Sequence, residues 1–212
     1  MTHHRRRSLF LSAEKVKLPL SAAALLLAAE GCNPTQEGSP GPSSEAVQAL
    51  LGSPRMVQAV EKSTAHLLSL RGSLGLDSQH GFVARSAVQD DLGLLHMRLD
   101  QTYRGVRVWE GEAIVELSRE NSARSVIHTL RAGIDVPTQA TLSRAEALSI
   151  AQSDLQPQGS YASDPTVELV IYPQMVPQVR AQRLRGPEGE LNAEDVEHVV
   201  GRYQLAYYVR TA

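Results

Sequence analysis

The sequence has few of the residues that crosslink a chain or fill its core with rings. It contains one cysteine in 212 residues, so a disulfide within the chain is excluded. Aromatic residues make up only 4% of the chain, and its cores must therefore rest on leucine, valine, alanine and isoleucine. The formal net charge is −2, without the bulk positive charge typical of nucleic-acid binding. We expect one or two modest globular domains and no nucleic-acid partner.

Catalytic motifs are also missing. A zinc peptidase of the H-E-x-x-H type places two imidazoles one helical turn apart, beside a glutamate that activates water, and none of the seven histidines begins such a motif. Neither a G-x-S-x-G elbow nor a glycine-rich phosphate loop occurs. The adjacent carboxylates Asp90-Asp91 and Glu194-Asp195 are typical of solvated turns, because neighbours on a strand point to opposite faces. We expect no enzyme activity, no catalytic or metal-binding residues and no cofactor.

The first 32 residues are typical of an export leader. Three arginines at 5–7 precede the apolar run LPLSAAALLLAA at 18–29, which is too short to span a bilayer comfortably. The run stops at Gly31-Cys32, and a small residue before a lone cysteine resembles a bacterial lipoprotein signal, in which the cysteine is acylated. We expect residues 1–32 to be a signal peptide of this type, with Cys32 as the lipidation site. The mature protein would then be a membrane-anchored envelope lipoprotein, or a secreted protein in which Cys32 is a free thiol.

A tether and a helix follow the leader. Residues 33–53 begin with NPTQEGSPGPSS, which is rich in proline, glycine and serine and lacks periodicity, so we expect a flexible tether and a short helix. Ser53-Pro54 is typical of an N-cap followed by proline at the first helical position. An irregular apolar stripe predicts that this second helix runs to Arg71, with Gly72 as its C-cap.

Residues 90–117 predict a β-hairpin, because two runs of alternating polarity flank the turn Arg104-Gly105. Glu110-Gly111 is expected to make a bulge in the second strand, after a core position at Trp109. His96, Arg98 and Asp100 should point away from the apolar face. That face is expected to carry Leu95, Met97, Leu99, Val106, Val108, Ala113, Val115 and Leu117.

The same stretch, DDLGLLHMRLDQTYRGVRVWEGEAIVEL, resembles the core of the FTP domain, named for the fungalysin/thermolysin propeptide. The residues assigned to the family motif are Asp91, Gly93, His96, Arg98, Gln101, Tyr103, Gly105 and Val108. The resemblance implies an FTP-like domain over residues 54–135, a helix packed on an antiparallel sheet. Its last strand would cover residues 123–130, after a turn at Asn121-Ser122. We expect the polar motif residues to order the hairpin rather than to perform chemistry.

A second unit is predicted over residues 136–212. Ser143 and Glu146 form a capping box, and the helix that they open is expected to end at Leu155. One face of that helix should carry Ala145, Leu148, Ala151 and Leu155. Strands are expected at 167–172 and at 204–211, the first of them ended by Pro173.

The order of these segments resembles a PepSY domain, the usual C-terminal partner of FTP in thermolysin-like propeptides. Residues 173–201 depart from that pattern, since arginine- and glutamate-rich sequence lengthens a usually short connection. We expect an exposed loop or an extended ribbon there. The expected fold is thus α+β, with two small cystatin-like modules, each a helix packed on an antiparallel sheet.

The pair of domains implies a propeptide function. In thermolysin-like zinc metalloproteases this region assists folding of the catalytic domain and masks its cleft. The chain is therefore expected to be a non-catalytic chaperone or inhibitor acting in trans on such a catalytic domain, and a lipid on Cys32 would add the membrane as a partner. Two alternatives stay open: the propeptide half of a truncated protease precursor, and an envelope lipoprotein with a structural or adhesive role.

Overall fold

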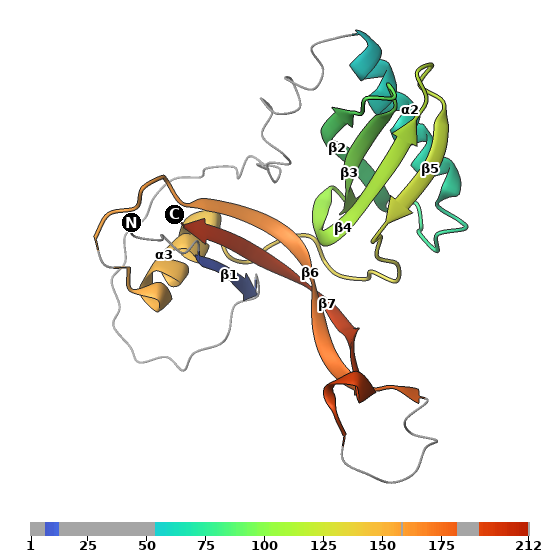
Figure 1. The fold of residues 1–212 in the computed structure, drawn as a ribbon. Coiled ribbons are helices and arrows are strands. Elements are labelled where there is room, and N and C mark those ends of the chain that lie inside the picture. Colours follow the sequence, from blue (N-terminus) through green and yellow to red (C-terminus); the bar gives the residue numbers. More distant parts are fainter. Residues whose placement is uncertain (1–6, 13–53, 158, 182–190, 212) are drawn as a thin grey trace, which may run out of the picture.

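A computed structural model describes residues 7–12, 54–157, 159–181 and 191–211 of the chain (Figure 1). The described residues have an α+β fold, which confirms the predicted class. Its elements are β1 (Arg7–Ser12), α2 (Pro54–Leu70), β2 (His80–Gln89), β3 (Leu95–Tyr103), β4 (Val106–Leu117), β5 (Ala123–His128), α3 (Arg144–Leu155), β6 (Thr166–Val179), a 3-10 turn (Ala193–Asp195) and β7 (Val196–Thr211). The strands form one mixed sheet in the order β1-β7-β6-β4-β3-β2, and β5 also pairs with β4.

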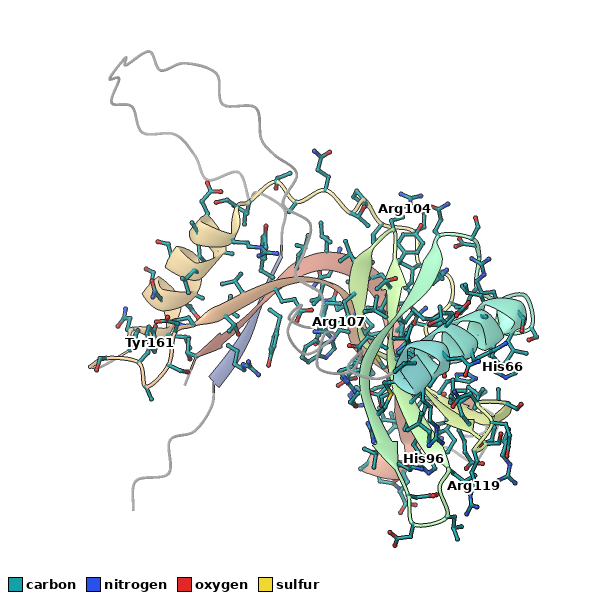
Figure 2. The ribbon with its side chains drawn as sticks, turned by 90° about the horizontal axis from the view of Figure 1, so that it is seen from above. His66, His96, Arg104, Arg107, Arg119 and Tyr161 are labelled. Carbon is teal, nitrogen blue, oxygen red and sulfur yellow. The ribbon has the colours of Figure 1, made fainter. Side chains whose placement is uncertain are left out.

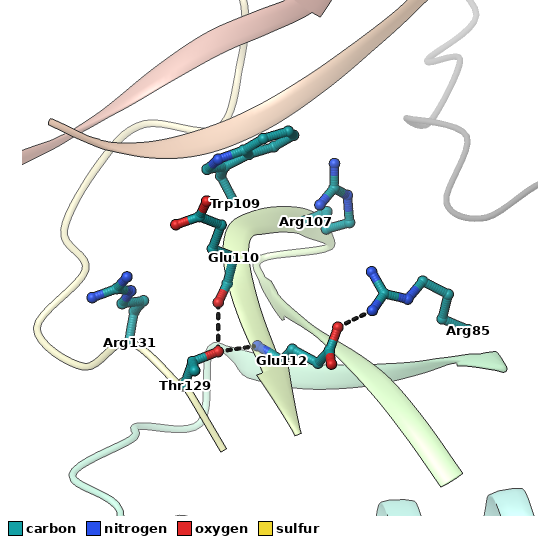
Figure 3. Close-up of a pocket in the computed structure, with 7 residues that line it drawn as sticks. All are labelled: Arg85, Arg107, Trp109, Glu110, Glu112, Thr129 and Arg131. Carbon is teal, nitrogen blue, oxygen red and sulfur yellow. Dashed lines mark hydrogen bonds and ion pairs between the residues drawn. The ribbon is translucent and has the colours of Figure 1, made fainter. Parts of the chain in front are cut away.

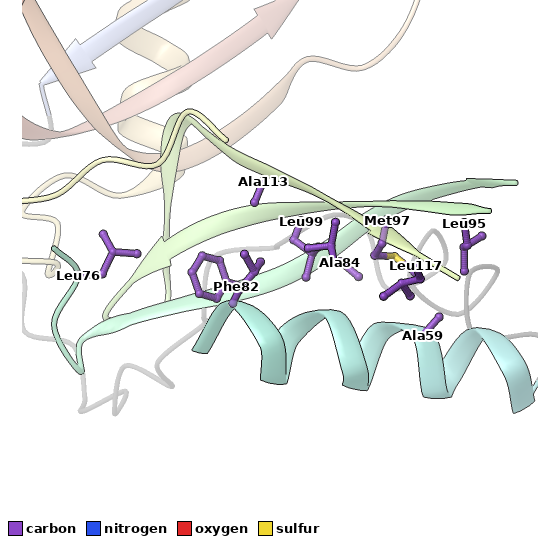
Figure 4. Close-up of a cluster of buried hydrophobic side chains, with 11 residues drawn as sticks. Ala59, Leu76, Phe82, Ala84, Leu95, Met97, Leu99, Ala113 and Leu117 are labelled. Carbon is purple, nitrogen blue, oxygen red and sulfur yellow. The ribbon is translucent and has the colours of Figure 1, made fainter. Parts of the chain in front are cut away.

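Helix α2 covers one face of the antiparallel strands β2 to β5 (Figure 4). Pro54 occupies its first position, where the missing N–H removes no helical hydrogen bond, as predicted. Alternation along β3 and β4 sends most of the predicted apolar residues toward the helix, and each fully buried leucine there contributes about 2 kcal/mol. Val106 and Val108, predicted for the same face, lie instead in the core of the second unit. The buried core of this unit consists of Ala59, Leu67, Leu76, Phe82, Ala84, Leu95, Met97, Leu99, Ala113, Val115 and Leu117.

The end of α2 differs from the prediction that Gly72 is its C-cap. The helix ends at Leu70, and the chain continues in turns as far as Gly75, which has a φ of 68°. The N–H of Leu76 then donates to the carbonyl of Arg71 at 2.9 Å. This closure needs a left-handed residue just before Leu76, and glycine adopts that conformation without steric cost.

The β3–β4 hairpin has the predicted turn and the predicted bulge. Arg104 and Gly105 have φ values of 48° and 80°, as a two-residue turn matched to the twist of the strands requires. Asp100 pairs with Glu112 but Thr102 pairs with Arg107, so residues 108–111 bulge out opposite Gln101. Glycine is required at 111, because a Cβ there would lie 2.6 Å from Oε1 of Gln101.

In the second unit, α3 packs on β6 and β7. The predicted capping box is present, with the Ser143 side chain accepting from the N–H of Glu146 at 3.2 Å. The predicted buried face was wrong at Ala145, which is exposed, whereas Ala147 and Ala151 are buried. Residues four apart lie about 40° apart around a helix and residues six apart about 120°, so Ala145 cannot share a face with Ala151. The surrounding core contains Tyr103, Val106, Val108, Ile134, Val136, Ala147, Ile171, Leu205 and Tyr207.

Strands β6 and β7 extend beyond the body as a two-stranded ribbon (Figure 1). The prediction that Pro173 ends its strand was wrong, because β6 continues to Val179 and Pro173 pairs with Tyr203. Among the described strands, β6 meets β4 only at Val170 and Ile171. Beyond these residues its outer edge is unpaired, so a proline without an N–H removes no ladder bond. Of the two structures expected for residues 173–201, an exposed loop or an extended ribbon, the described part of this segment therefore forms the ribbon.

The two units meet through one short parallel contact. Arg107 and Val108 of β4 pair with Val170 and Ile171 of β6, and all other pairing among the described strands is antiparallel. The connecting segment before α3 contacts both units. The backbone of its Arg131 is hydrogen-bonded to Gln101 of the first unit, and its Ile134 is buried in the second core. The helix-and-strand units thus share a sheet instead of being joined by a free linker.

Strand β1 pairs antiparallel with β7, from Arg7 opposite Thr211 to Ser12 opposite Ala206. It belongs to the segment predicted as an export leader. The rest of that leader, Cys32 and the tether at 33–53 lie outside the described residues, so leader, lipidation and tether stay predictions. None of the helices described in the structure is long and apolar enough to cross a membrane.

Candidate functional site: the motif hairpin and the junction pocket

The face of β2 to β5 opposite α2 carries paired charges. Nη1 of Arg98 lies 2.8 Å from Oε1 of Glu112, and Arg85 pairs with both Glu112 and Asp100, the latter at 3.2 Å. His96 lies at the other end of the same face, away from the Arg104 turn (Figure 2). Alternation puts these side chains opposite the core residues, as predicted for His96, Arg98 and Asp100. Two exposed apolar side chains lie on this face, Val88 on β2 at 61% exposure and Ile127 on β5 at 71%, and Leu92 in the loop before β3 is 70% exposed.

In the loop before β3, Asp90 makes the contacts and Asp91 is exposed. Oδ1 of Asp90 accepts from the N–H of Leu92 at 3.0 Å and from that of Leu94 at 2.8 Å, and its Oδ2 lies 3.1 Å from Nε2 of His96. The hydrogen bond with His96, together with these two N–H groups, holds the pKa of Asp90 below its usual value. The structural partner of the His96 motif position is therefore Asp90.

Gln101 ties the motif hairpin to the segment that leads to α3. Its Nε2 donates to the carbonyl of Arg131 at 2.7 Å, and its Oε1 accepts from the N–H of Arg131 at 2.8 Å. Gln101 is fully buried, so both ends of its amide need these partners. Tyr103 is also buried and packs edge-on against His80, with ring centroids 5.1 Å apart. Gly105 lies in the turn and Val108 lies in the second core.

A pocket of about 440 Å³ opens where the two units meet (Figure 3). We call it the junction pocket. Strand β2 supplies one residue, β4 supplies four around the bulge, and the segment after β5 supplies two. Its lining residues are Arg85, Arg107, Trp109, Glu110, Glu112, Thr129 and Arg131. Sequence reasoning missed this site, and the only signal for it was the predicted bulge at Glu110-Gly111.

Trp109 is not a core residue, contrary to the prediction. It is partly buried, and its ring centroid lies 4.6 Å from that of Tyr208. The guanidinium carbon of Arg107 lies 5.2 Å from the indole centroid, within the range of a cation–π contact. The preceding residue, Val108, is buried in the second core, so alternation along the strand turns Trp109 to the opposite face, where Tyr208 lies.

Arg107 also forms the principal ion pair between the units. Its Nε and Nη2 donate to the two carboxylate oxygens of Glu168 at 2.6 and 2.8 Å. Burial alone would lower the pKa of Arg107, but the hydrogen bonds and charge of Glu168 raise it. Burial raises the pKa of Asp100, against the opposing effect of Arg85 and Arg107. These partly buried charges are thus held in compensated pairs.

Thr129 fixes the bulge from the neighbouring segment. Its hydroxyl donates to the carbonyl of Glu110 at 2.6 Å and accepts from the N–H of Glu112 at 3.3 Å (Figure 3). Glu110 has a φ of 57°, a left-handed conformation that is strained for a glutamate. This backbone directs the exposed Glu110 side chain toward the side of the pocket where Trp109 lies (Figure 3).

The chemistry of this arrangement is that of binding. Within the described ranges no three histidine, cysteine, aspartate or glutamate side chains gather as metal ligands would. Guanidinium groups, carboxylates and an indole at the mouth of a pocket can hold a charged or amphipathic partner. The described residues thus form an α+β fold with a charged pocket where its two units meet.

A family model described as the Fungalysin/Thermolysin Propeptide Motif matches residues 80–130. The match starts at the first residue of β2 and ends two residues beyond β5. It therefore contains the whole antiparallel sheet of the first unit, the bulge and all the motif residues. The matched model describes a propeptide domain and not the catalytic domain of such proteases. No curated protein matches the chain.

Proposed function

We propose that this chain is a non-catalytic propeptide-like protein that binds the catalytic domain of a thermolysin-like zinc metalloprotease in trans. The observation that carries the proposal is the propeptide match at 80–130, which coincides with a complete sheet backed by α2. A module that binds the native protease and not its unfolded chain stabilises the native state by mass action. The same binding excludes substrate wherever the module covers the cleft.

The finer assignments belong to the same proposal. Residues 136–212 would be a PepSY-like module, which makes the chain two cystatin-like modules in tandem; α3 packed on β6 and β7 supports this. The motif residues would serve structure, as the contacts of His96 and Gln101 suggest. Residues 1–32 would direct export, with a lipid on Cys32.

The surface that we propose for the protease is the outer face of β2 to β5. It combines exposed Val88 and Ile127 with paired charges such as Arg98–Glu112. Apolar side chains set among charged pairs of both signs are the mixture found at non-obligate interfaces. Helix α2 occupies the opposite face, so a partner can approach the outer face without disturbing the core.

The test adds the purified full chain to a thermolysin-like protease and measures casein hydrolysis and the refolding yield of the denatured enzyme. We expect lower hydrolysis or a higher yield. Ile127→Lys on the outer face should weaken either effect by about tenfold, which is about 1.4 kcal/mol of binding. Val57→Lys is the matched control, because Val57 is 46% exposed and lies on α2.

If Ile127→Lys and Val57→Lys weaken the effect equally, the outer face of β2 to β5 is not the interface with the protease. No effect of the wild-type chain on thermolysin-like proteases from the same cell would overturn the trans-acting proposal and favour the structural or adhesive alternative. An effect seen only when the chain is covalently joined to a catalytic domain would favour the precursor alternative, since a link supplies a high effective concentration. Cell fractionation of wild type and Cys32→Ser tests the lipid anchor, which predicts membrane partitioning for wild type alone.

A further inference from the structure

We propose that the junction pocket binds a carboxylate group of an extended peptide segment. The proposal depends on the proposed function only for where such a segment would come from, a protease partner. The carboxylate could belong to an acidic side chain or to a chain terminus, and the experiment below separates the two.

Among the charged side chains that line the pocket, Arg131 and Glu110 have no ion-pair partner in the described residues. Arg85 is committed to Asp100 and Glu112, and Arg107 is committed to Glu168. The side chain of Arg131, in contrast, makes no hydrogen bond or ion pair with another described residue, and its shielded Nε has no acceptor. Arg131 as a whole is only partly buried, so a carboxylate from outside can make a charge-assisted hydrogen bond with its guanidinium.

The neighbouring groups suit a peptide rather than a bare anion. The Glu110 side chain makes no hydrogen bond or ion pair with another described residue, and its strained backbone presents it beside Trp109 (Figure 3). A carboxylate at this position accepts hydrogen bonds from peptide N–H groups, which a small anion does not have. Trp109 is only partly buried, so the part of its indole that Tyr208 and Arg107 leave uncovered offers an apolar surface for an aliphatic side chain. One acceptor site, one donor site and one apolar surface thus converge on a cavity of about 440 Å³.

The cavity has the size of a site for a few residues of extended chain. In the arrangement that we infer, the peptide carboxylate meets Arg131, a peptide N–H meets Glu110, and an aliphatic side chain covers Trp109. The backbone of Arg131 is anchored to Gln101 through its own N–H and carbonyl. The guanidinium can therefore be removed without breaking that anchor.

The experiment uses Trp109, the only tryptophan in the chain, as its reporter. The indole N–H cross peak of the isotope-labelled full chain is followed during titration with three peptides. Acetyl-Leu-Glu-Leu-amide carries a side-chain carboxylate, and acetyl-Leu-Gln-Leu carries only a terminal one. Acetyl-Leu-Gln-Leu-amide carries none and is the control. We expect at least one carboxylate peptide to bind about tenfold or more tightly than the control, with an affinity that falls as salt is raised.

Two charge-matched variants locate the effect. Arg131→Gln should reduce the affinity of the carboxylate peptide to that of the control peptide. Arg124→Gln should leave it unchanged, because Arg124 lies on β5, outside the pocket lining, with a side chain that is 55% exposed. Unfolding curves of both variants show whether the fold is kept. A Trp109→Phe chain, followed by calorimetry, should lose part of the affinity while keeping the preference for a carboxylate.

Equal binding of all three peptides, or no shift of the Trp109 peak with any of them, overturns the proposal. So does loss of binding in Arg124→Gln as well as in Arg131→Gln, since that result would reflect net charge alone. These readouts need no protease. If the chain binds the peptides but leaves proteases unaffected, the carboxylate site stands and the proposed function fails. If the chain acts on proteases but does not bind the peptides, the proposed function stands and the carboxylate site fails.

Discussion

Single residues with a positive φ mark the strained points of this chain. Among the described residues, those other than glycine are Arg104, Glu110, Asn121 and Gln156. The side chain of Asn121 has its own partners on helix α2. Its buried amide donates to the carbonyl of Arg55 at 3.3 Å and to Oε1 of Gln58 at 3.0 Å. The side chain of Glu110 makes no hydrogen bond with another described residue, and its backbone carbonyl is held by the hydroxyl of Thr129. The strain at Glu110 therefore reflects the surrounding structure, not a preference of the residue.

Glycine should accordingly have opposite effects at these two positions. Glu110→Gly relieves the left-handed strain and should raise the free energy of unfolding by about 0.5–1 kcal/mol in urea denaturation. Asn121→Gly keeps the backbone conformation but removes two buried hydrogen bonds, and should lower it by about 1 kcal/mol or more. A loss of stability in Glu110→Gly would show that its side chain, rather than its backbone, matters to the fold.

Asp90 and Asp91 are adjacent carboxylates with different surroundings, and pH distinguishes them. The folded-state pKa of Asp90 is lowered, chiefly by the hydrogen bond with His96, so its ionised form stabilises the fold above the unfolded value. That contribution should be lost as the pH falls through the lowered pKa. Asp90→Asn should therefore be less stable than wild type at pH 6, by a margin that shrinks at pH 3. Asp91→Asn should match wild type at both values in thermal unfolding, and a deficit like that of Asp90→Asn would assign the loop contacts to the wrong aspartate.

At the scale of elements, the important connection is the one between the motif hairpin and the segment before α3. Gln101 lies opposite the bulge of β4 and binds both backbone groups of Arg131. It therefore fixes where the chain leaves the first sheet on its way to the buried Ile134 of the second core. A residue within the family motif thus positions the second unit.

Gln101→Met keeps the size of the side chain and removes both hydrogen bonds. It leaves a backbone N–H and a carbonyl without partners in a buried place, so the free energy of unfolding should fall by about 2–4 kcal/mol. Gln89→Met is the control, since Gln89 is exposed and its side chain makes one hydrogen bond of 3.3 Å to the carbonyl of Gly93. Its effect should stay within about 0.5 kcal/mol. Similar losses in the two variants, measured in urea, would show that Gln101 is not an anchor.

At the scale of the whole molecule, the two units are coupled at the turn end of the motif hairpin, where Tyr103, Val106 and Val108 lie in the core of the second unit. Two parallel residue pairs, the ion pair between Arg107 and Glu168 and the contact of Trp109 with Tyr208 join β4 to the strands of the second unit. Since both units contribute to one sheet, we expect a single unfolding transition in the wild-type chain.

Glu168→Gln should weaken that coupling. It leaves Arg107 partly buried without its carboxylate, which should cost about 1–3 kcal/mol. Fluorescence of Trp109 at the junction should then change at a lower urea concentration than far-UV circular dichroism, whereas the two curves coincide in wild type. Glu197→Gln is the control, because its pair with Arg180 on the ribbon is 3.6 Å long and exposed. Coincident curves in Glu168→Gln would mean that the units unfold together without this ion pair.

Local sequence was sufficient for much of this fold. Ser143 and Glu146 satisfy free N–H groups within one turn, and Arg104-Gly105 supplies the two positive φ angles of its turn, so neither depends on distant residues. Predictions failed where burial or pairing is decided at long range. Pro173 is tolerated inside β6 because no described strand occupies its outer edge. Trp109 lies outside the core because the neighbouring Val108 takes the core position.

The sequence by itself determined the α+β class, the apolar face of the hairpin, the bulge and the resemblance to a propeptide domain. Each of these features follows from hydrophobic periodicity, from turn residues or from the motif in one continuous stretch, because the interactions behind them join residues only a few positions apart. Only the tertiary structure decided that the units share a sheet, that Asp90 is the partner of His96, and that Arg131 approaches Trp109 in a pocket. Such contacts join residues far apart in the chain, and their geometry exists only when strands from both units have paired.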